Sequence, residues 1–109
     1  EKQQKTDEGK LILAAVSASD TLILFDEKGS AYTSKNFAQF LQKKMNAGTK
    51  KLVFVIGGPY GFSQEVYARA QGKVALSQMT FSHQMVRIFV AEQLYRAFSI
   101  LNNQPYHHE

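Results

Sequence analysis

The chain has 109 residues, 44% of them hydrophobic and 20% charged, which is the composition of one globular domain with a modest core. It contains no cysteine, which excludes disulfides and zinc–thiolate sites and favours a cytosolic location. Its apolar runs all fall short of the roughly 20 residues that a membrane span needs, so no membrane partner is expected.

The net charge of +4 favours a polyanionic partner, with nucleic acid as the first candidate. A lysine-rich solvated surface would carry the same charge. Charge alone therefore leaves both interpretations open.

In chain order, the first predicted element is a helix that runs through Val16. Its apolar stripe consists of Leu11, Ile12, Ala15 and Val16. A buried strand over residues 21–25 follows, and the polar residues 26–30 are expected to form the turn that closes it.

Ser34 is the predicted N-cap of a second helix that runs to about Asn46. Its apolar stripe consists of Phe37, Phe40, Leu41 and Met45. Residues 52–56 are all apolar, the pattern of a strand buried on both faces in a parallel sheet. This strand ends at a glycine-rich turn, residues 57–61, where backbone without Cβ atoms is open to a ligand.

A third helix is predicted from Ser63 to about Ala70, followed by a short strand or extended segment over residues 74–79. Ser82 begins a long last helix that ends near Leu101. The alternation of helices and strands predicts an α/β fold with a parallel sheet between helices.

The last helix is apolar around most of its circumference, which predicts burial on both sides. A domain of this size has little core in which to bury such a helix alone, so we expect a homodimer interface along it. A helix central to the core of a single chain is the alternative.

The glycine-rich turn lacks both the GxGxxG pattern and the GK[ST] ending of a P-loop. A site for a phosphate or nucleoside and a plain tight turn therefore both remain open. His83 and Arg87 lie one turn apart at the start of the last helix, a natural position for an anion. The alternative is that Arg87 lies in a protein–protein interface, where its guanidinium is hydrogen-bonded to protein groups.

Two polar pairs lie near the C-terminus. Glu92 and Arg96 are spaced i,i+4, which an ordinary surface salt bridge would explain. His107 and His108 lack the further ligands of a metal-binding motif, so no metal site is expected.

Taken together, four segments of the chain resemble one family closely. They are residues 54–63 (FVIGGPYGFS), 75–87 (ALSQMTFSHQMVR), 91–97 (AEQLYRA) and 103–109 (NQPYHHE). The family is the RlmH family of SPOUT-class RNA methyltransferases, which methylate N3 of a pseudouridine in large-subunit ribosomal RNA. The resemblance covers essentially the whole chain, although family members carry a further N-terminal strand–helix–strand segment.

The resemblance implies that residues 1–109 form one methyltransferase domain with the SPOUT α/β trefoil knot, lacking that N-terminal segment. It also implies a homodimer packed partly through the last helix. S-adenosylmethionine would sit in the knot, held mainly by backbone groups. Its contacts would be Phe25, Gly58, Leu76, Ser77, Gln78, Met79, Thr80 and Phe81.

The implied chemistry is in-line attack by the pseudouridine N3 on the sulfonium methyl, so the protein mostly positions the reactants. His107 would be the base or a substrate contact, Arg96 would hold phosphate or the developing anion, and Glu92 would orient Arg96. The remaining contacts to the ribosomal RNA, expected in the assembled ribosome, would come from His83, Arg87, Tyr106 and His108. His108 stands where the family commonly has arginine, which replaces a fixed charge with a titratable one.

Two functions of other classes remain as alternatives. One is a non-catalytic module that binds nucleotide or RNA through the glycine-rich turn. The other is a structural domain whose only role is dimerisation through the last helix.

Overall fold

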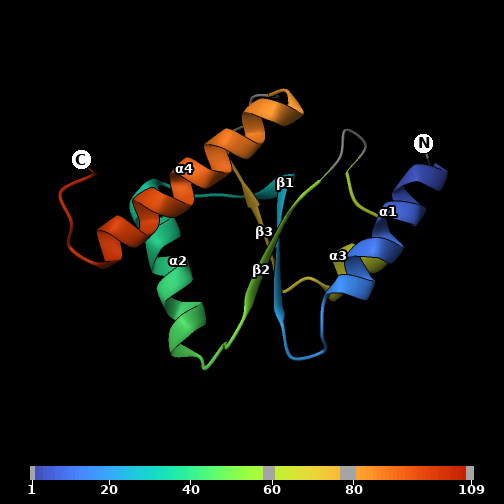
Figure 1. Cartoon of the computed structure of the whole chain (residues 1–109), viewed down its shortest axis with the longest axis horizontal. Coiled ribbons are helices and arrows are strands. Elements are labelled where there is room, and N and C mark those ends of the chain that lie inside the picture. Colours follow the sequence, from blue (N-terminus) through green and yellow to red (C-terminus); the bar gives the residue numbers. More distant parts are fainter. Residues whose placement is uncertain (1, 58–60, 77–80, 108–109) are drawn as a thin grey trace.

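The computed structural model describes residues 2–57, 61–76 and 81–107. These residues form a three-stranded parallel sheet with helices on both faces (Figure 1). The elements are α1 (Lys2–Ala15), β1 (Thr21–Ala31), α2 (Ser34–Asn46), β2 (Leu52–Ile56), α3 (Gln64–Arg69), β3 (Gly72–Ala75) and α4 (His83–Leu101). The predicted α/β architecture is confirmed.

Strand β1 is the centre of the sheet, whose order is β2-β1-β3. Thr21 pairs with Leu52, and the parallel register continues to Phe25 opposite Ile56. The prediction that residues 52–56 are buried on both faces is wrong, since all five are only partly buried. The reason is position in the sheet: β2 is an edge strand, and the central β1 takes the fully buried place.

Residues 26–30 are not the closing turn that their polarity predicts, because β1 continues through them to Ala31. The register with β3 shifts here, since Phe25 and Ser30 both lie opposite Val74. A Cβ added at Gly29 would lie 2.6 Å from the backbone nitrogen of Val74, so the two strands approach closely only because this residue is glycine. The bulge carries the chain on to the start of α2.

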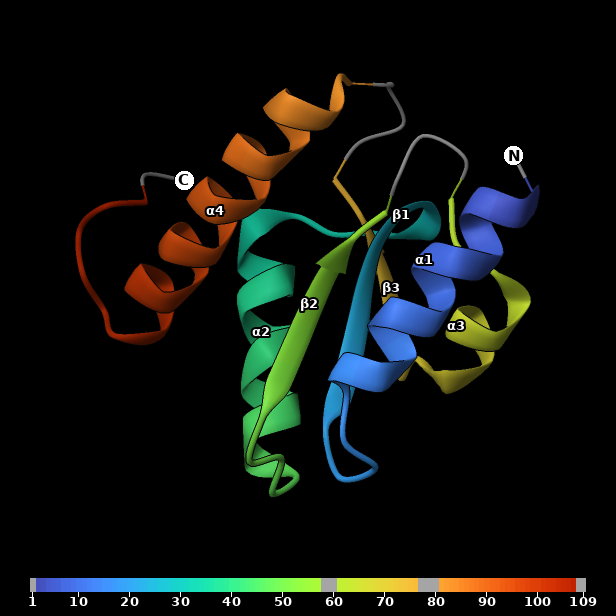
Figure 2. The same cartoon turned by 45° about the vertical axis from the view of Figure 1, so that its right-hand side comes forward.

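Alternate residues of β1 supply two hydrophobic cores on opposite faces of the sheet. Leu22 and Leu24 pack with Phe62 and Val66 on the face covered by α1 and α3 (Figure 2). Ile23 and Phe25 pack on the face covered by α2 and α4, with Phe37, Ala38, Leu41, Val74, Val90 and Ala97. The sheet is therefore covered on both faces, as in other parallel α/β sheets.

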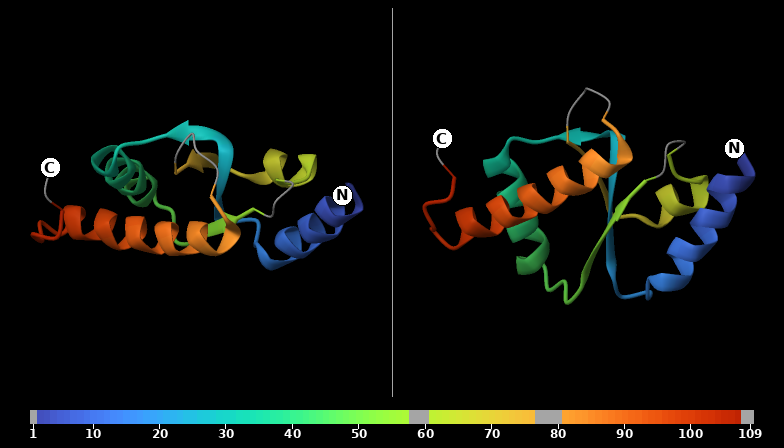
Figure 3. Two further views of the ribbon diagram at one scale, coloured as in Figure 1. Left: turned by 90° about the horizontal axis from the view of Figure 1, so that it is seen from above. Right: turned by 45° about the horizontal axis from the view of Figure 1, so that its top comes forward.

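The residues that helix α1 buries differ from the predicted apolar stripe. Leu11 is 73% exposed and Ala15 is exposed, while Ile12, Leu13 and Val16 contact the core. Since α1 packs against the short α3 at the side of the sheet, it buries a narrower strip than its apolar residues would allow. Figure 3 shows α1 and the tail after α4 at opposite ends of the molecule.

The predicted starts of the third and last helices, at Ser63 and Ser82, are confirmed. Ser63 and Ser82 cap α3 and α4, each accepting a hydrogen bond from a backbone amide three residues on. The prediction for α2 is one residue too late, because Thr33 is the cap and its Oγ1 accepts from the amide of Asn36 at 3.1 Å. Ser34 is the first helical residue, which leaves its hydroxyl to reach α4.

The predicted strand over residues 74–79 begins earlier, at Gly72, and ends at Ala75. Residues 77–80 lie outside the described residues, as do residues 58–60 of the glycine-rich turn. The knot expected from the family resemblance depends on these two segments.

Helix α4 is not buried on both sides within the described chain. Val90 and Ala97 are buried, but Ile88 and Tyr95 on the other side are 59% and 58% exposed. Met85 and Phe98 belong to the same exposed face. No helix in the described ranges is both long and apolar enough to cross a bilayer.

Candidate active site

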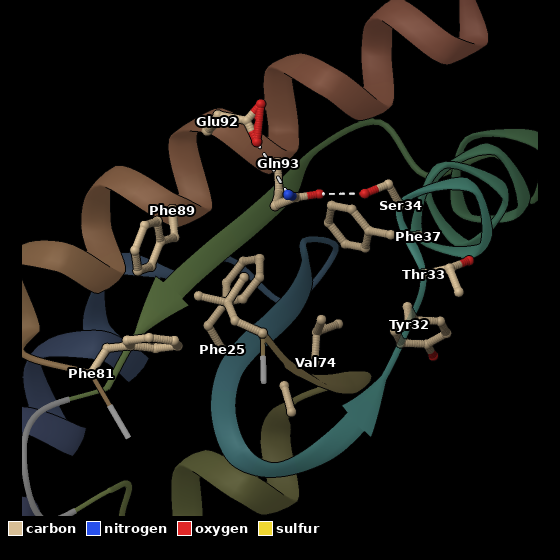
Figure 4. A pocket seen from close by; sticks show the side chains of 12 residues that line it. Phe25, Tyr32, Thr33, Ser34, Phe37, Val74, Phe81, Phe89, Glu92 and Gln93 are labelled. Carbon is tan, nitrogen blue, oxygen red and sulfur yellow. Dashed lines mark hydrogen bonds between the residues drawn. The ribbon is translucent and has the colours of Figure 1, made fainter. Parts of the chain in front are cut away.

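A pocket of about 500 Å³ lies at the carboxyl ends of β1 and β3, between α2 and α4 (Figure 4). This is the edge of a parallel sheet at which ligands usually bind. The lining residues are Phe25, Tyr32, Thr33, Ser34, Phe37, Val74, Ala75, Leu76, Phe81, Phe89, Glu92 and Gln93. Aromatic walls with a few polar groups are typical of small-molecule sites.

Three of the predicted cofactor residues, Phe25, Leu76 and Phe81, line this pocket. The ring of Phe81 meets the ring of Phe89 edge to face, with centroids 5.0 Å apart, and so forms one wall. The other predicted cofactor residues, Gly58, Ser77, Gln78, Met79 and Thr80, lie outside the described residues. The volume and the flat apolar walls fit a nucleoside-sized cofactor such as S-adenosylmethionine.

Sequence reasoning missed the part of the pocket that comes from the start of α2. Tyr32, Thr33 and Ser34 reach the pocket because the bulged β1 continues past Phe25. Gln93 was also missed, although it neighbours Glu92. The one available signal was Gly29, whose lack of a side chain permits the bulge.

A polar chain runs from α2 to α4 along the pocket wall (Figure 4). The Ser34 hydroxyl donates to Oε1 of Gln93 at 2.9 Å, and Nε2 of Gln93 donates to Oε1 of Glu92 at 3.1 Å. These two hydrogen bonds give the Glu92 carboxylate a fixed neighbour, Gln93, on the pocket side.

On its other side, Glu92 is held by Arg96. Nη2 and Nε of Arg96 lie 2.9 and 3.1 Å from Oε2 of Glu92, a charge-assisted contact through two nitrogens. The Tyr106 hydroxyl donates to the same oxygen at 3.0 Å. Hydrogen bonds from Arg96, and secondarily from Tyr106, lower the pKa of the Glu92 carboxyl, while the bond to Glu92 raises the pKa of Tyr106. Glu92 is therefore a carboxylate at neutral pH.

The C-terminal tail folds back onto α4. Asn103 has φ of 56°, the left-handed conformation that reverses a chain after a helix. The Tyr106 ring then lies on the Arg96 guanidinium, 4.9 Å from ring centroid to Cζ, and packs edge to face on Tyr95. Nδ1 of His107 lies 2.9 Å from Nη1 of Arg96.

The structure thus brings together four predicted site residues, Glu92, Arg96, Tyr106 and His107, which we call the tail cluster. Other predicted site residues are not part of it. Arg87 lies on an exposed face of α4 and is absent from the described lining of the pocket. His83 is the first residue of α4, while His108 lies outside the described residues.

No group of three or more potential metal ligands occurs among the described residues. The candidate site consists of the aromatic pocket and the tail cluster. Glu92 belongs to both, because it lines the pocket and anchors Arg96.

A family model described as "Predicted SPOUT methyltransferase" matches residues 1–107. Curated proteins named "Ribosomal RNA large subunit methyltransferase H" are similar along the whole chain. The protein of Flavobacterium johnsoniae is 65% identical over 109 residues, which are 100% of this chain and 69% of that protein. The protein of Christiangramia forsetii is 62% identical over 108 residues, 99% of this chain and 69% of that protein.

A solved structure of Nep1 from Archaeoglobus fulgidus, bound to S-adenosylhomocysteine, superimposes with a TM-score of 0.52. The two proteins share 18% sequence identity, and the superposition covers 77% of this chain and 38% of the Nep1 chain. At this identity the similarity shows a common fold.

Proposed function

This chain belongs to the SPOUT methyltransferase family, and we propose that it methylates large-subunit ribosomal RNA with S-adenosylmethionine as the methyl donor. The observation that carries the proposal is the 65% identity, over the whole chain, to a ribosomal RNA large subunit methyltransferase H. The aromatic pocket at the carboxyl edge of the sheet supports it. As one methyltransferase domain, the chain would act in the cytoplasm, where ribosomes are assembled.

The pocket residues that would hold the cofactor are Phe25, Leu76 and Phe81, with Gly58 and residues 77–80 added by the family resemblance. Phe81 and Phe89 offer flat apolar walls against which an adenine could pack. When bound, S-adenosylmethionine supplies a methyl group already attached to a good leaving group. The protein is then left with binding, orientation and exclusion of water.

We further propose N3 of a pseudouridine as the methylated atom, with the tail cluster as its contact surface. Arg96 supplies a fixed positive charge for phosphate or the developing anion, and Glu92 orients Arg96 through the contact described above. His107 serves as base or substrate contact. His83, Arg87, Tyr106 and His108 are proposed as further RNA contacts.

The exposed apolar face of α4, formed by Met85, Ile88, Tyr95 and Phe98, supports a homodimer. Large apolar side chains that line up on one helix face are costly to leave in water. A second copy of the chain would cover them, so we propose that the protein acts as a homodimer through α4.

Calorimetric titration of the protein with S-adenosylmethionine, S-adenosylhomocysteine and ATP tests the cofactor. Binding of the first two and not of ATP is expected, whereas binding of ATP alone would favour a nucleotide-binding module. Transfer of a labelled methyl group to ribosomes that lack the modification, compared with naked ribosomal RNA, tests the substrate. Cofactor binding without transfer to either would contradict the proposed reaction.

A further inference from the structure

The positive charge of the chain is concentrated in one continuous stretch, residues 28–64. This stretch contains no aspartate or glutamate, and it carries six of the ten lysines. They are Lys28, Lys35, Lys43, Lys44, Lys50 and Lys51. Outside the stretch the nine acidic residues outnumber the remaining basic ones, and α1 mixes its lysines with Asp7 and Glu8. The net positive charge therefore belongs mainly to α2 and to the segment that joins it to β2.

The outer side of α2 is a row of lysine and amide side chains without a carboxylate. Lys35, Gln39 and Lys43 are exposed and follow one another at intervals of four residues, which places them on one side of the helix. Asn46, also exposed, lies on the same side. The opposite side of the helix is buried against the sheet. We call these four exposed residues the α2 face.

The fold itself does not account for the lysines of the α2 face. Among the described residues, neither Lys35 nor Lys43 forms an ion pair with a carboxylate. Lys35 lies in the first turn of α2, which contains no acidic residue. The partial positive charge at this end of a helix favours an acidic side chain and disfavours a cation. Lys35 is thus placed against the preference of its own helix, which points to a negatively charged partner outside the chain.

The α2 face starts beside the pocket and leads away from it. Ser34, the residue before Lys35, lines the pocket, and α2 runs from there to the opposite edge of the sheet (Figure 2). The helical rise separates Lys35 from Lys43 by about 12 Å along the helix axis. A nucleic acid strand with one nucleotide at the pocket can therefore continue along α2 and meet both lysines.

We propose that the α2 face binds the phosphate backbone of ribosomal RNA beside the nucleotide that is methylated. The inference rests on the proposed function and adds to it a surface that holds the substrate outside the pocket. Lysine ammonium groups bind phosphate as point charges, and the side-chain amides of Gln39 and Asn46 can donate to phosphate oxygens. A second copy of the chain does not suit this face, because lysine is depleted at protein–protein interfaces and two such faces would repel each other.

The charge reversal Lys35→Glu tests the α2 face without weakening the fold. A glutamate in the first turn suits the helix end, so the variant should unfold at the same temperature as the parent or at a higher one. Its Kd for ribosomes that lack the modification should rise about 10-fold at 0.1 M salt, and the slope of log Kd against log salt should fall by about one. Lys10→Glu is the matched control, because Lys10 is exposed but lies on α1, which covers the other face of the sheet. The control should keep the parent's Kd and salt slope, and both variants should keep its affinity for S-adenosylmethionine.

An unchanged Kd and salt slope in Lys35→Glu, or an equal loss of affinity in Lys10→Glu, would overturn the inference. The same titration on protein-free large-subunit ribosomal RNA identifies the partner, and the loss should recur there. A loss confined to whole ribosomes would assign the α2 face to a ribosomal protein and would also overturn the inference. A parent protein that binds ribosomes but transfers no methyl group would instead refute the proposed function, and one that does not bind ribosomes would refute both.

Discussion

Glu92 connects the two halves of the candidate site. Its carboxylate lines the aromatic pocket and also anchors Arg96, on which Tyr106 and His107 lie. A surface pair at i,i+4 normally stabilises a helix by only about 0.3–0.5 kcal/mol. Its importance here lies in orientation, because the same guanidinium that binds Glu92 also contacts the tail.

Replacing Glu92 with glutamine should lower methyl transfer about 10-fold to 100-fold, because the charge-assisted contacts that hold Arg96 are lost. Cofactor affinity should change little, since Phe25, Leu76 and Phe81 remain. Kinetics at saturating cofactor measure the loss of methyl transfer, and calorimetry measures cofactor affinity as the control. A variant that loses cofactor binding and keeps its kcat would contradict this role.

Glu92 also makes the stability of the folded protein depend on pH in the acid range. Hydrogen bonds from Arg96 lower the folded-state pKa of Glu92 below its ordinary value of 4.5, so its contribution to stability is present above that value and is lost as pH falls through the folded pKa. Urea unfolding of the parent and Glu92→Gln between pH 7 and pH 3 should therefore converge at low pH. A difference that stays constant over this range would argue against the ionic contact.

Tyr67 makes the stability of the folded protein depend on pH in the alkaline range. Burial, together with its hydrogen bond to Asp26, raises its pKa to about 12. The folded state thus keeps a proton that the unfolded chain loses near pH 10, and stability falls as pH rises from about 10 to 12. Tyr67→Phe should be about 1–2 kcal/mol less stable at pH 7 and should lose less stability in that alkaline range. If the free energy of unfolding fell with pH in the same way in the parent and in Tyr67→Phe, Tyr67 would not be the group responsible.

At the scale of single elements, α4 has two different long faces. Val90 and Ala97 are buried against the sheet and α2, while Ile88 and Tyr95 are exposed. An apolar pattern around a whole helix shows that both sides avoid water, but it does not show what covers each side. The tertiary structure separates the side buried by the chain itself from the side that we assign to a second copy.

Ile88→Glu should weaken the proposed homodimer at least 100-fold, because it places a charge in the centre of an apolar interface. Sedimentation at micromolar concentration would show a monomer where the parent sediments as a dimer. Leu11→Glu is the matched control, since Leu11 is 73% exposed but lies on α1. A dimer that persists in Ile88→Glu, or that dissociates equally in Leu11→Glu, would place the interface elsewhere.

At the scale of the whole molecule, the pocket exists because a central strand continues where its polarity predicts a turn. The bulge between Phe25 and Ser30 keeps β1 beside β3 and delivers Tyr32 and the start of α2 to the pocket. Its narrowest point is Gly29 against the backbone of β3. A distant glycine therefore shapes the pocket without contacting a ligand.

Gly29→Ala should destabilise the protein by about 1–3 kcal/mol, because its Cβ would lie 2.6 Å from backbone atoms of Lys73 and Val74, which have little room to move. The affinity for S-adenosylmethionine should fall at the same time, since the bulge positions one wall of the pocket. Denaturant titration and calorimetry measure the two effects. Unchanged stability would mean that β1 and β3 separate without cost.

Local spacing along the sequence was enough to determine the helices, the parallel α/β class and the helix starts at Ser63 and Ser82. These features depend on neighbours within a few residues, and the family motifs are equally local. Only the tertiary structure decided that β1 is central, that residues 26–30 bulge, and that Gln93 and Ser34 meet across the pocket. Each of these depends on the register of segments far apart in the chain, which side-chain periodicity within one segment does not specify.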